Sequence, residues 1–309
     1  MRIGLIFGGD TTEGEVSKMS ASGINGSLQK LGYEVIKIEF DKNVALHILD
    51  ANVDAVFNAM HGRYGEDGSL QGLLDIMKIP YTHSGLLASA IAMNKRISKQ
   101  IFKDLGITTP KGIVVSKEEL VSDKWKEIVK GSILKSNKEL FIKPVCDGSS
   151  RDAFLVHDID NFSFADKKLS TASKEFLIEE HIIGRELQVS VIGEKAIGVL
   201  EIIPNKDKSE FYDYNAKYNE KGAVHKVYDE NEEIKQQVME YAEKIHKAFG
   251  LKDISRSEFL LTKDNEIYAL EVNSHPGFTP TSIVPEMANM AGISYDDLVE
   301  MLVKNAKYY

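Results

Sequence analysis

The sequence has almost no cysteine: Cys146 is the only one among 309 residues, so the chain cannot form an internal disulfide. A chain of this kind suits a reducing compartment, and we expect a cytoplasmic protein. Runs of about 18 consecutive apolar residues are also missing, so we expect no membrane-spanning helix. We expect no signal peptide, because Gly8, Gly9 and Asp10 end the first apolar run too early for a signal core.

Positive charge is in the minority. The chain has 38 Lys and Arg against 47 Asp and Glu, which gives a net charge of −9. An acidic surface argues against nucleic acid or an anionic membrane as the main partner, although a local pocket can still bind an anionic ligand. The length is sufficient for a buried core and for two or three compact units.

The first part of the chain shows strand and helix signals in the order of an open α/β sheet. Apolar runs that predict strands occupy residues 2–7, 33–40 and 53–60. A glycine pair and a helical pattern that ends near Leu31 follow the first run. We place an N-terminal α/β domain at residues 1–93.

The rest of the chain divides into a middle domain at residues 94–181 and a C-terminal domain at residues 182–309. Helices are predicted at residues 84–105 and 230–249, and strands at 140–145 and 176–180. Alternating patterns predict two hairpins, one from residues 187–192 and 196–203, the other from residues 257–261 and 267–272. Residues 204–228 form a long irregular stretch, and long loops inside compact domains are usually functional.

The second hairpin gives the sharpest chemical prediction. A turn centred on Asp264 and Asn265 places Glu258 opposite Glu271 and Arg256 opposite Asn273, with all four side chains on one face. Like charges directly opposite each other destabilise a sheet. Two carboxylates beside an amide therefore suggest Mg²⁺, although the acids could also avoid each other on a solvated face.

Other candidate residues are weaker when each is taken alone. Lys143 precedes the Gly148-Ser149-Ser150 loop and could hold phosphate, or it could extend from the strand end into solvent. Glu15 lies near the start of the first helix, where the helix dipole favours an acid without any function. His61 follows a strand at the edge where α/β sheets bind ligands, but a lone histidine is more often structural.

Taken together, these residues resemble the D-alanine–D-alanine ligase family of the ATP-grasp superfamily. The matching strings are Gly8-Gly9 with Glu13-Gly14-Glu15-Val16-Ser17, His61-Gly62-Arg63-Tyr64-Gly65-Glu66-Asp67-Gly68, Lys143-Pro144 with Gly148-Ser149-Ser150, Ala216-Lys217-Tyr218, and Glu271-Val272-Asn273 with Pro276-Gly277. Several such strings in the right order make the resemblance specific. It implies an ATP-grasp fold, a homodimer and a role in peptidoglycan synthesis.

The resemblance also implies a reaction and the residues that perform it. ATP would phosphorylate the carboxylate of one D-alanine, and the amine of a second would attack the acyl phosphate. Glu258, Glu271 and Asn273 would hold two Mg²⁺ ions, or Mn²⁺, and Arg256 would stabilise the intermediate. The nucleotide would contact Lys95, Lys143, Ser149, Ser150, Glu179, Glu180, His181, Ile182, Glu186, Phe211, Lys217 and Leu270. The substrates would contact Glu15, His61, Tyr212, Gly277, Ser282 and Ile283. Glu15, Ser149 and Tyr218 would form a hydrogen-bonded triad.

The chain departs from the family where Arg151 and Asp152 stand in place of the usual Val-Gly, and smaller departures are Gly14, Asn94 and Glu258. Asp152 would bring a carboxylate near the phosphates unless it is turned away or paired. Two other hypotheses stay open. One is a related ligase that makes D-alanyl-D-lactate, D-alanyl-D-serine or another dipeptide. The other is a nucleotide-binding protein without turnover.

Overall fold

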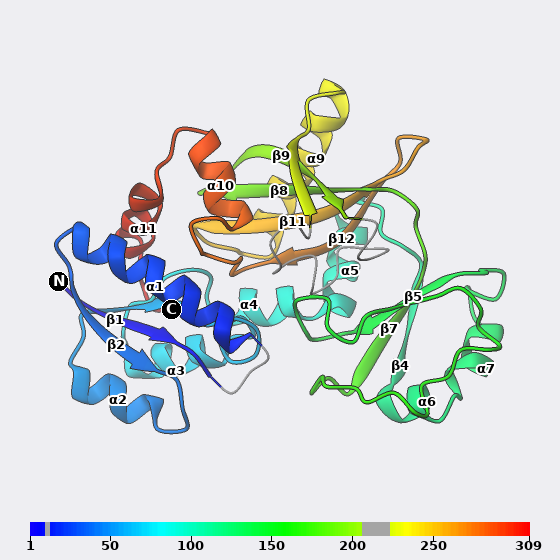
Figure 1. Cartoon of the computed structure of the whole chain (residues 1–309), viewed down its shortest axis with the longest axis horizontal. Coiled ribbons are helices and arrows are strands. Elements are labelled where there is room, and N and C mark those ends of the chain that lie inside the picture. The colour runs from blue at the N-terminus through cyan, green and yellow to red at the C-terminus, as the bar shows by residue number, and fades with distance from the viewer. Residues whose placement is uncertain (10–12, 206–222) are drawn as a thin grey trace.

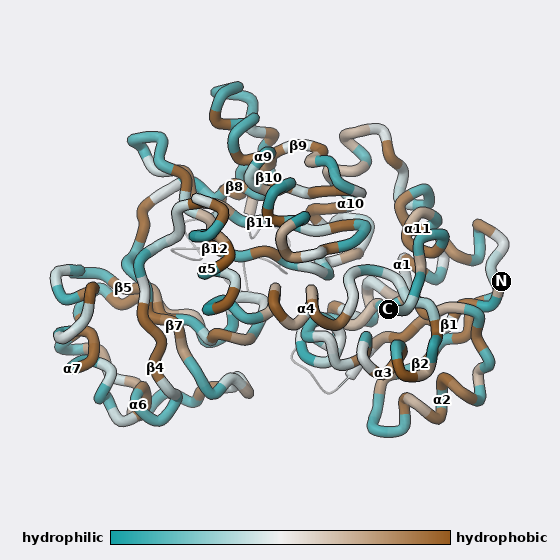
Figure 2. The backbone as a smooth tube through the Cα atoms, turned by 180° about the vertical axis from the view of Figure 1, so that it is seen from behind, coloured by the Kyte–Doolittle hydropathy of each residue, from teal (hydrophilic) through white to brown (hydrophobic). Residues whose placement is uncertain are grey.

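The computed structural model describes residues 1–9, 13–205 and 223–309, which form three sheets with helices around them (Figure 1). A three-stranded sheet belongs to the N-terminal unit, a four-stranded sheet to the middle unit and a five-stranded sheet to the C-terminal unit. Figure 2 shows that the hydrophobic stretches follow the strands and α4, while the outer loops are hydrophilic. This distribution is the one expected when the strands supply the core of each unit.

The N-terminal sheet is parallel, with β1 between β2 and β3. Its unit consists of β1 (Arg2–Phe7), α1 (Gly14–Lys30), β2 (Glu34–Glu39), α2 (Val44–Ala51), β3 (Ala55–Asn58), α3 (Ser69–Met77) and α4 (Leu86–Met93). Gly8 and Gly9 have φ angles of 87° and 93°, which glycine adopts without strain, and they turn the chain out of β1. The carboxyl ends of β1 and β2 point toward the other two units (Figure 1).

The structure has two helices where the sequence predicts one at residues 84–105. Asn94 has an extended conformation after α4, and its side chain accepts a hydrogen bond from the Ile97 N–H at the start of α5 (Lys95–Asp104). An amide in this position caps a new helix and ends the preceding one. The break turns Lys95 and Lys99 of α5 into the interior, where both are buried.

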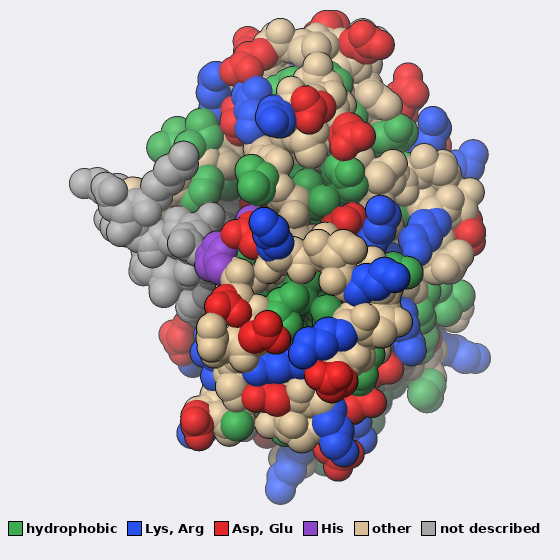
Figure 3. All heavy atoms as spheres, turned by 90° about the vertical axis from the view of Figure 1, so that its right-hand side faces the viewer, with side chains coloured by type: hydrophobic (Ala, Val, Ile, Leu, Met, Phe, Trp, Pro, Cys, Tyr) green, Lys and Arg blue, Asp and Glu red, His purple; other side chains and the backbone are tan. Residues whose placement is uncertain are grey.

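The middle unit is an antiparallel sheet in the order β4-β7-β5-β6, with two short helices over one side. Its elements are β4 (Gly112–Ser116), α6 (Lys117–Val121), α7 (Trp125–Lys130), β5 (Leu140–Pro144), β6 (Phe154–Val156) and β7 (Glu175–Glu180). Trp125 and Phe164 are fully buried and pack edge to face in its core. On the face of the molecule shown in Figure 3, lysine, arginine and acidic side chains are interspersed.

The C-terminal unit has the sheet order β10-β9-β8-β11-β12. Its elements are β8 (Arg185–Ile192), β9 (Lys195–Pro204), β10 (Ala223–Val227), α9 (Glu232–Ala248), β11 (Ile254–Leu261), β12 (Ile267–Asn273), α10 (Ile283–Met290) and α11 (Tyr295–Lys304). Helix α9 packs against β8, β9 and β11 through Ile234, Val238 and Ile245. Both predicted hairpins are confirmed.

The N-terminal and C-terminal units share a hydrophobic core. Ile24 and Leu28 of α1 cluster with Leu298 and Leu302 of α11, and the chain end pairs with the N-terminal unit through Tyr81 and Lys307. The N-terminal and C-terminal units therefore do not have separate hydrophobic cores. The domain boundaries at residues 93 and 181 stay predictions. In the described ranges no helix combines the length and the hydrophobicity needed to cross a bilayer.

Candidate active site

Two neighbouring cavities lie where the three units meet. The first, of about 370 Å³, lies between the start of α1, the loop after β3, the β11–β12 hairpin and the start of α10. The second, of about 550 Å³, lies between the sheets of the middle and C-terminal units. Lys95, Asp147, Gly148 and Glu271 line both cavities. A ligand in one cavity can therefore meet a ligand in the other at this shared wall.

Most of the predicted site residues fall into these two cavities. The first is lined by Glu15, His61, Ser149, Arg256, Asn273, Gly277, Ser282 and Ile283. The second is lined by Lys143, Ser150, Glu179, Glu180, His181, Ile182, Glu186, Glu258 and Leu270. Four predicted residues lie outside the described part of the chain: Phe211, Tyr212, Lys217 and Tyr218. The division separates the predicted substrate residues from most of the predicted nucleotide residues.

The register of the β11–β12 hairpin is confirmed at its functional end. Glu258 pairs with Glu271 and Arg256 with Asn273, as the sequence predicted. Nearer the turn the pairing shifts by one residue, because a bulge leaves Leu270 without a partner between two paired positions. A bulge redirects side chains locally, and here it leaves both Leu270 and Glu271 on the wall of the second cavity.

Cations already approach the two facing carboxylates. Arg256 Nη2 lies 2.5 Å from Glu258 Oε1, and Lys95 Nζ lies 3.4 Å from Glu271 Oε2. In the described part of the chain no group of three or more His, Cys, Asp or Glu side chains is arranged to hold a metal ion. Two carboxylates and an amide still fit Mg²⁺, which commonly takes few protein ligands and completes its shell with phosphate oxygens and water.

The carboxylate that meets Ser149 is Glu13, which corrects the predicted contact with Glu15. The Ser149 hydroxyl donates a hydrogen bond to Glu13 Oε1. Glu15 instead points outward from α1, with 87% of its side chain exposed and Oε1 3.1 Å from Lys18 Nζ. Helical periodicity explains the difference, because position 13 continues the buried stripe of Val16 and Ser20, whereas position 15 shares the exposed face with Lys18.

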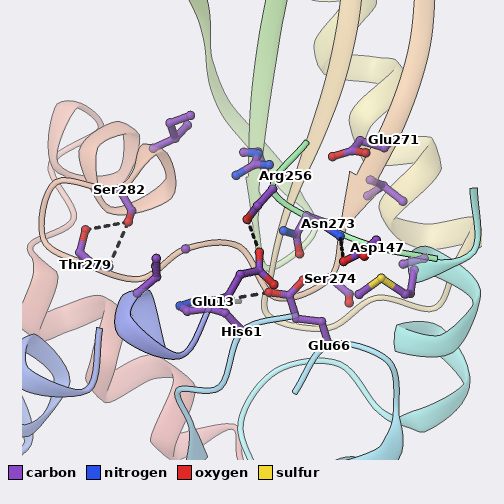
Figure 4. A pocket seen from close by; sticks show the side chains of 18 of the residues that line it. Glu13, His61, Glu66, Asp147, Arg256, Glu271, Asn273, Ser274, Thr279 and Ser282 are labelled. Atoms are coloured by element: carbon purple, nitrogen blue, oxygen red, sulfur yellow. Dashed lines mark hydrogen bonds and ion pairs between the residues drawn. The ribbon is translucent and has the colours of Figure 1, made fainter. Parts of the chain in front are cut away.

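Glu13 is held in a close-fitting polar pocket (Figure 4). Gly62 has a φ of 65°, and a Cβ added there would overlap the Glu13 carboxylate, so this position favours glycine. A Cβ at Gly148 would lie 3.2 Å from Oε1, which is a tight contact. Burial and, next, the negative charge of Glu66 raise the pKa of Glu13 to about 7, against the lowering effect of the Ser149 hydrogen bond. A cationic ligand group would favour the ionised form and gain a charge-assisted hydrogen bond.

His61 lies beside Glu13 and is fixed through both ring nitrogens. Nδ1 lies 3.2 Å from Glu66 Oε1, and Nε2 lies 2.9 Å from the Ser20 hydroxyl on α1. Glu66 was not among the predicted site residues, although it stands in the same matched string as His61. Because both nitrogens have partners, the ring keeps one orientation toward the first cavity.

The opposite end of the first cavity is formed by the start of α10. Ser282 is the residue before this helix, and its hydroxyl accepts a hydrogen bond from the Thr279 N–H at 3.0 Å. A Cβ at Gly277 would lie 3.2 Å from the same hydroxyl, so glycine keeps this corner open. The N-terminus of a helix favours an anion, so this end suits a carboxylate. In Figure 4, Arg256 lies above Glu13, and Ser282 and Thr279 lie to the left of both.

The second cavity brings lysines and acids together on the middle sheet. Lys143 Nζ lies 2.8 Å from Glu179 Oε2, and Lys95 Nζ donates to the Asp147 carbonyl at 2.7 Å. Burial disfavours the charge of Lys143, but attraction to Glu179 and then to Glu271 outweighs it, and the pKa of Lys143 is raised. A permanently charged ammonium on the cavity wall suits a phosphate ligand.

Other predicted nucleotide residues have side chains engaged at the rim. Glu180 Oε1 accepts from the Lys111 N–H at 2.8 Å, and His181 Nδ1 lies 2.9 Å from Glu139 Oε2. The side chains of Glu180 and His181 therefore already bind other protein groups. A ligand at residues 180–182 would bind their backbone N–H and C=O groups. Glu186 Oε1 accepts from Gln188 Nε2 at 2.7 Å.

The loop that carries the family departure has a strained backbone. Ser149, Ser150 and Asp152 have φ angles of 54°, 53° and 50°. The Asp152 carboxylate accepts hydrogen bonds from the Thr171 N–H at 2.6 Å and from the Ser170 hydroxyl at 3.1 Å. Asp152 is thus held within the middle unit and does not line the second cavity, so its carboxylate is turned away from a phosphate ligand bound there.

Comparisons with known proteins agree with this geometry. Family models described as the D-ala D-ala ligase N-terminus and C-terminus match residues 47–84 and 101–304. D-alanine–D-alanine ligases from Wolbachia pipientis and Rickettsia massiliae are 39% and 41% identical, over 98% and 99% of this chain and 94% and 92% of theirs.

Solved structures show the same likeness. The crystal structure of D-alanine–D-alanine ligase from Bacillus anthracis matches with a TM-score of 0.83 at 34% identity, over 98% of this chain and 96% of that one. Its complex with ATP matches with a TM-score of 0.79 at 31% identity and the same coverage. The predicted α/β fold of the ATP-grasp class is therefore confirmed. The chain belongs to the D-alanine–D-alanine ligase family.

Proposed function

We propose that this protein joins two D-alanines into D-alanyl-D-alanine with ATP, releasing ADP and phosphate, to supply peptidoglycan synthesis. The observation that carries the proposal is the pair of cavities that share the wall of Lys95, Asp147, Gly148 and Glu271. One cavity suits amino acids and the other suits a nucleotide. Family relatives named D-alanine–D-alanine ligase support the same reaction.

The first D-alanine would place its ammonium against Glu13, in place of the Glu15 contact expected from the sequence. Its carboxylate would then point toward the shared wall, where an oxygen attacks the terminal phosphorus of ATP and ADP leaves. The second D-alanine would place its carboxylate at the start of α10, against Ser282 and Ile283. Its amine attacks the acyl phosphate, and the tetrahedral intermediate expels phosphate. Arg256 would stabilise the negative oxygen of that intermediate.

We propose that Glu258, Glu271 and Asn273 hold Mg²⁺, with two ions bound or Mn²⁺ in its place. When bound, the metal supplies positive charge that neutralises the transferring phosphoryl group. Lys95 and Lys143 would hold the phosphates, and the edge of residues 179–182 would bind the adenine. Glu186 would bind the ribose, and Leu270 would pack on the base. Ser149 and Ser150 would cover the phosphates, while the roles of Phe211 and Lys217 stay predictions.

We further propose a cytoplasmic homodimer that binds neither nucleic acid nor membrane. Large apolar side chains are exposed on three helices of the N-terminal unit: Leu46 and Leu49 on α2, Ile76 on α3 and Leu87 on α4. Exposed apolar side chains on neighbouring elements are a common feature of association surfaces. Light scattering of the purified protein tests the dimer directly.

The reaction is tested by ADP release with ATP, Mg²⁺ and single amino acids. The proposal expects release with D-alanine, none with L-alanine, and D-alanyl-D-alanine as the product. Equal release with both enantiomers, or none with either, contradicts it, and the latter outcome favours a nucleotide-binding protein without turnover.

A second candidate is a ligase for another second substrate. A D-Ala:D-Ser ligase from Enterococcus faecalis matches with a TM-score of 0.80 at 27% identity, over 98% of both chains. D-serine and D-lactate therefore belong in the assay. The family resemblance also implies that Tyr218, which lies outside the described residues, helps to select the second substrate, and Tyr218→His tests this role. We expect less dipeptide and more ester with D-lactate, and an unchanged product ratio would remove Tyr218 from this role.

A further inference from the structure

A buried row of alternating charges lies behind the second cavity. Lys99 on α5, Glu179 on β7 and Lys143 on β5 follow one another, and each residue is buried or half-buried. Lys99 Nζ donates a hydrogen bond to Glu179 Oε1, and Lys143 Nζ lies 2.8 Å from Glu179 Oε2. One carboxylate is therefore shared by two ammonium groups, one on its cavity side and one on its interior side.

The ammonium of Lys99 is fully satisfied by the protein. Besides Glu179 it donates to the Thr109 hydroxyl at 3.0 Å and to the Pro110 carbonyl at 2.5 Å. A lysine ammonium has three donors, so these three acceptors use all of them. Lys99 thus has no hydrogen left for a ligand and can affect a bound ligand only through its neighbours, of which Glu179 is the charged one that lines the second cavity.

The position of Glu179 is set by the sheet. Glu179 pairs with Phe141 of β5, and Lys143 stands two residues further along the same face. Glu179 and Lys143 both line the second cavity, whereas Lys99 approaches from α5 behind its wall. The positive charge that Lys143 offers to a ligand therefore depends on how far the Glu179 carboxylate neutralises the Lys143 ammonium.

We propose that Lys99 is a positioning residue for nucleotide binding. It engages one oxygen of Glu179, so that the row carries one net positive charge and Lys143 keeps its attraction for phosphate. Without Lys99, Glu179 and Lys143 form a neutral pair at the cavity wall. Two charges interact strongly over a few ångströms away from bulk water, so the loss of one net charge weakens phosphate binding. The inference rests on the proposed phosphate contact of Lys143.

A purely structural role for Lys99 makes a different prediction. If Lys99 only ties α5 to β7, its removal disturbs the whole cavity wall, including the edge that would bind adenine. The affinities for ATP and for adenosine then fall together. If Lys99 is a positioning residue, only the contribution of the phosphates to nucleotide affinity should fall. This contribution is measured by the ratio of the adenosine dissociation constant to the ATP dissociation constant.

The experiment measures both dissociation constants with Mg²⁺ and without D-alanine, so that no turnover occurs. Lys99→Met is expected to lower the ratio about tenfold while adenosine binding stays within about twofold. Lys103→Met is the matched control, because it removes an exposed lysine one turn along α5, and it should leave the ratio unchanged. An equal loss of ATP and adenosine affinity in Lys99→Met overturns the proposal.

A double variant separates charge from packing. Lys99→Met with Glu179→Gln removes one charge of each sign, so the row again carries one net positive charge, that of Lys143. The proposal expects the ratio to return to within about threefold of the wild-type value. A further fall, which is what two additive structural defects would cause, overturns it. If Lys99→Met alone does not fold, Glu179→Gln alone must match or exceed the wild-type ratio, and a lower ratio overturns the proposal.

Lys143→Met distinguishes failure of this inference from failure of the proposed site. If Lys143→Met lowers the ratio and Lys99→Met does not, the phosphate contact stands and the role of Lys99 is wrong. If Lys143→Met also leaves the ratio unchanged, the proposed phosphate contact itself is wrong, and the inference is overturned with it.

Discussion

Glu13 and Glu179 are carboxylates with similar burial at the walls of two adjoining cavities, and their pKa values shift in opposite directions. Glu13 is 5% exposed, and burial together with the charge of Glu66 raises its pKa to about 7. Glu179 is 2% exposed, and burial again disfavours its charge, but attraction to Lys143 and then to Lys99 outweighs burial and lowers the pKa. Depth alone therefore does not decide the charge of a buried acid.

The contrast indicates which ligand each cavity suits. Around Glu179 the protein supplies the positive charges, so the acid is ionised and the net charge of the row suits phosphate. Around Glu13 the largest influences are burial and another acid, so the carboxylate gains most from a ligand that brings its own ammonium. Amino acid and nucleotide are thus separated by the electrostatics of the two walls, and they meet at Glu271.

The largest expected effect is at that shared wall. Glu271→Gln should lower turnover by about a hundredfold or more, because charge stabilisation at the phosphoryl group is worth several kcal/mol. Nucleotide binding should also lose its dependence on Mg²⁺. Glu266→Gln is the control, since Glu266 is exposed at the turn of the same hairpin. Near-normal turnover of Glu271→Gln at low Mg²⁺ would show that the metal assignment is wrong.

The next effect concerns which glutamate binds the first substrate. Glu13→Gln should raise the KM for D-alanine on the order of thirtyfold, because losing one partner of a buried charged pair costs about 2 kcal/mol or more. Glu15→Gln should change it by less than about twofold, since an exposed pair with Lys18 contributes little. The reverse ranking in steady-state kinetics would return the role to Glu15.

A smaller effect is the pH dependence of D-alanine binding. With a pKa of about 7, Glu13 becomes ionised as the pH rises, so D-alanine affinity should increase about tenfold between roughly pH 6 and pH 8. Without substrate, the free energy of unfolding depends on pH in the opposite direction. Between the ordinary value of 4.5 and about 7 the folded state binds the extra proton, so this group's contribution to the free energy of unfolding falls as the pH rises.

Thermal unfolding at several pH values, compared between wild type and Glu13→Gln, measures that contribution. The variant should lose less stability than the wild type as the pH rises through this window. Identical pH profiles for the two proteins would mean that Glu13 is already ionised in the free protein.

The smallest effect is expected at the family departure. Arg151→Val combined with Asp152→Gly should change ATP affinity by less than about threefold, because the Asp152 carboxylate is engaged by Ser170 and Thr171. A loss of more than tenfold, about 1.4 kcal/mol, would show that Arg151 itself contributes to binding.

The parts of the site differ in how far their structure can be predicted from the sequence. The hairpin geometry follows from alternation and a turn, so the pairing of Glu258 with Glu271 could be derived. The bulge at Leu270 could not, because the turn has more residues than the prediction assumed and no pattern marks the extra one. The break at Asn94 carried a signal, since a capping residue stood inside the predicted helix.

Glu13 and Lys99 show the limit of local patterns. The buried stripe of α1 already favours position 13 over position 15, but its partner Ser149 lies 136 residues away in sequence. Lys99 reads as an ordinary helix lysine, and only tertiary packing brings Glu179, 80 residues away, against it. Contacts between elements that are distant in sequence leave no periodic pattern in either segment.

The most direct test of the two-cavity account is a crossed comparison of Glu13→Gln and Lys143→Met, with the KM for D-alanine and for ATP measured in each at saturation of the other substrate. Glu13→Gln should raise the KM for D-alanine and leave the KM for ATP within about twofold, whereas Lys143→Met should raise the KM for ATP and leave the KM for D-alanine within about twofold. If either variant raises both KM values equally, the two cavities do not divide the substrates as proposed.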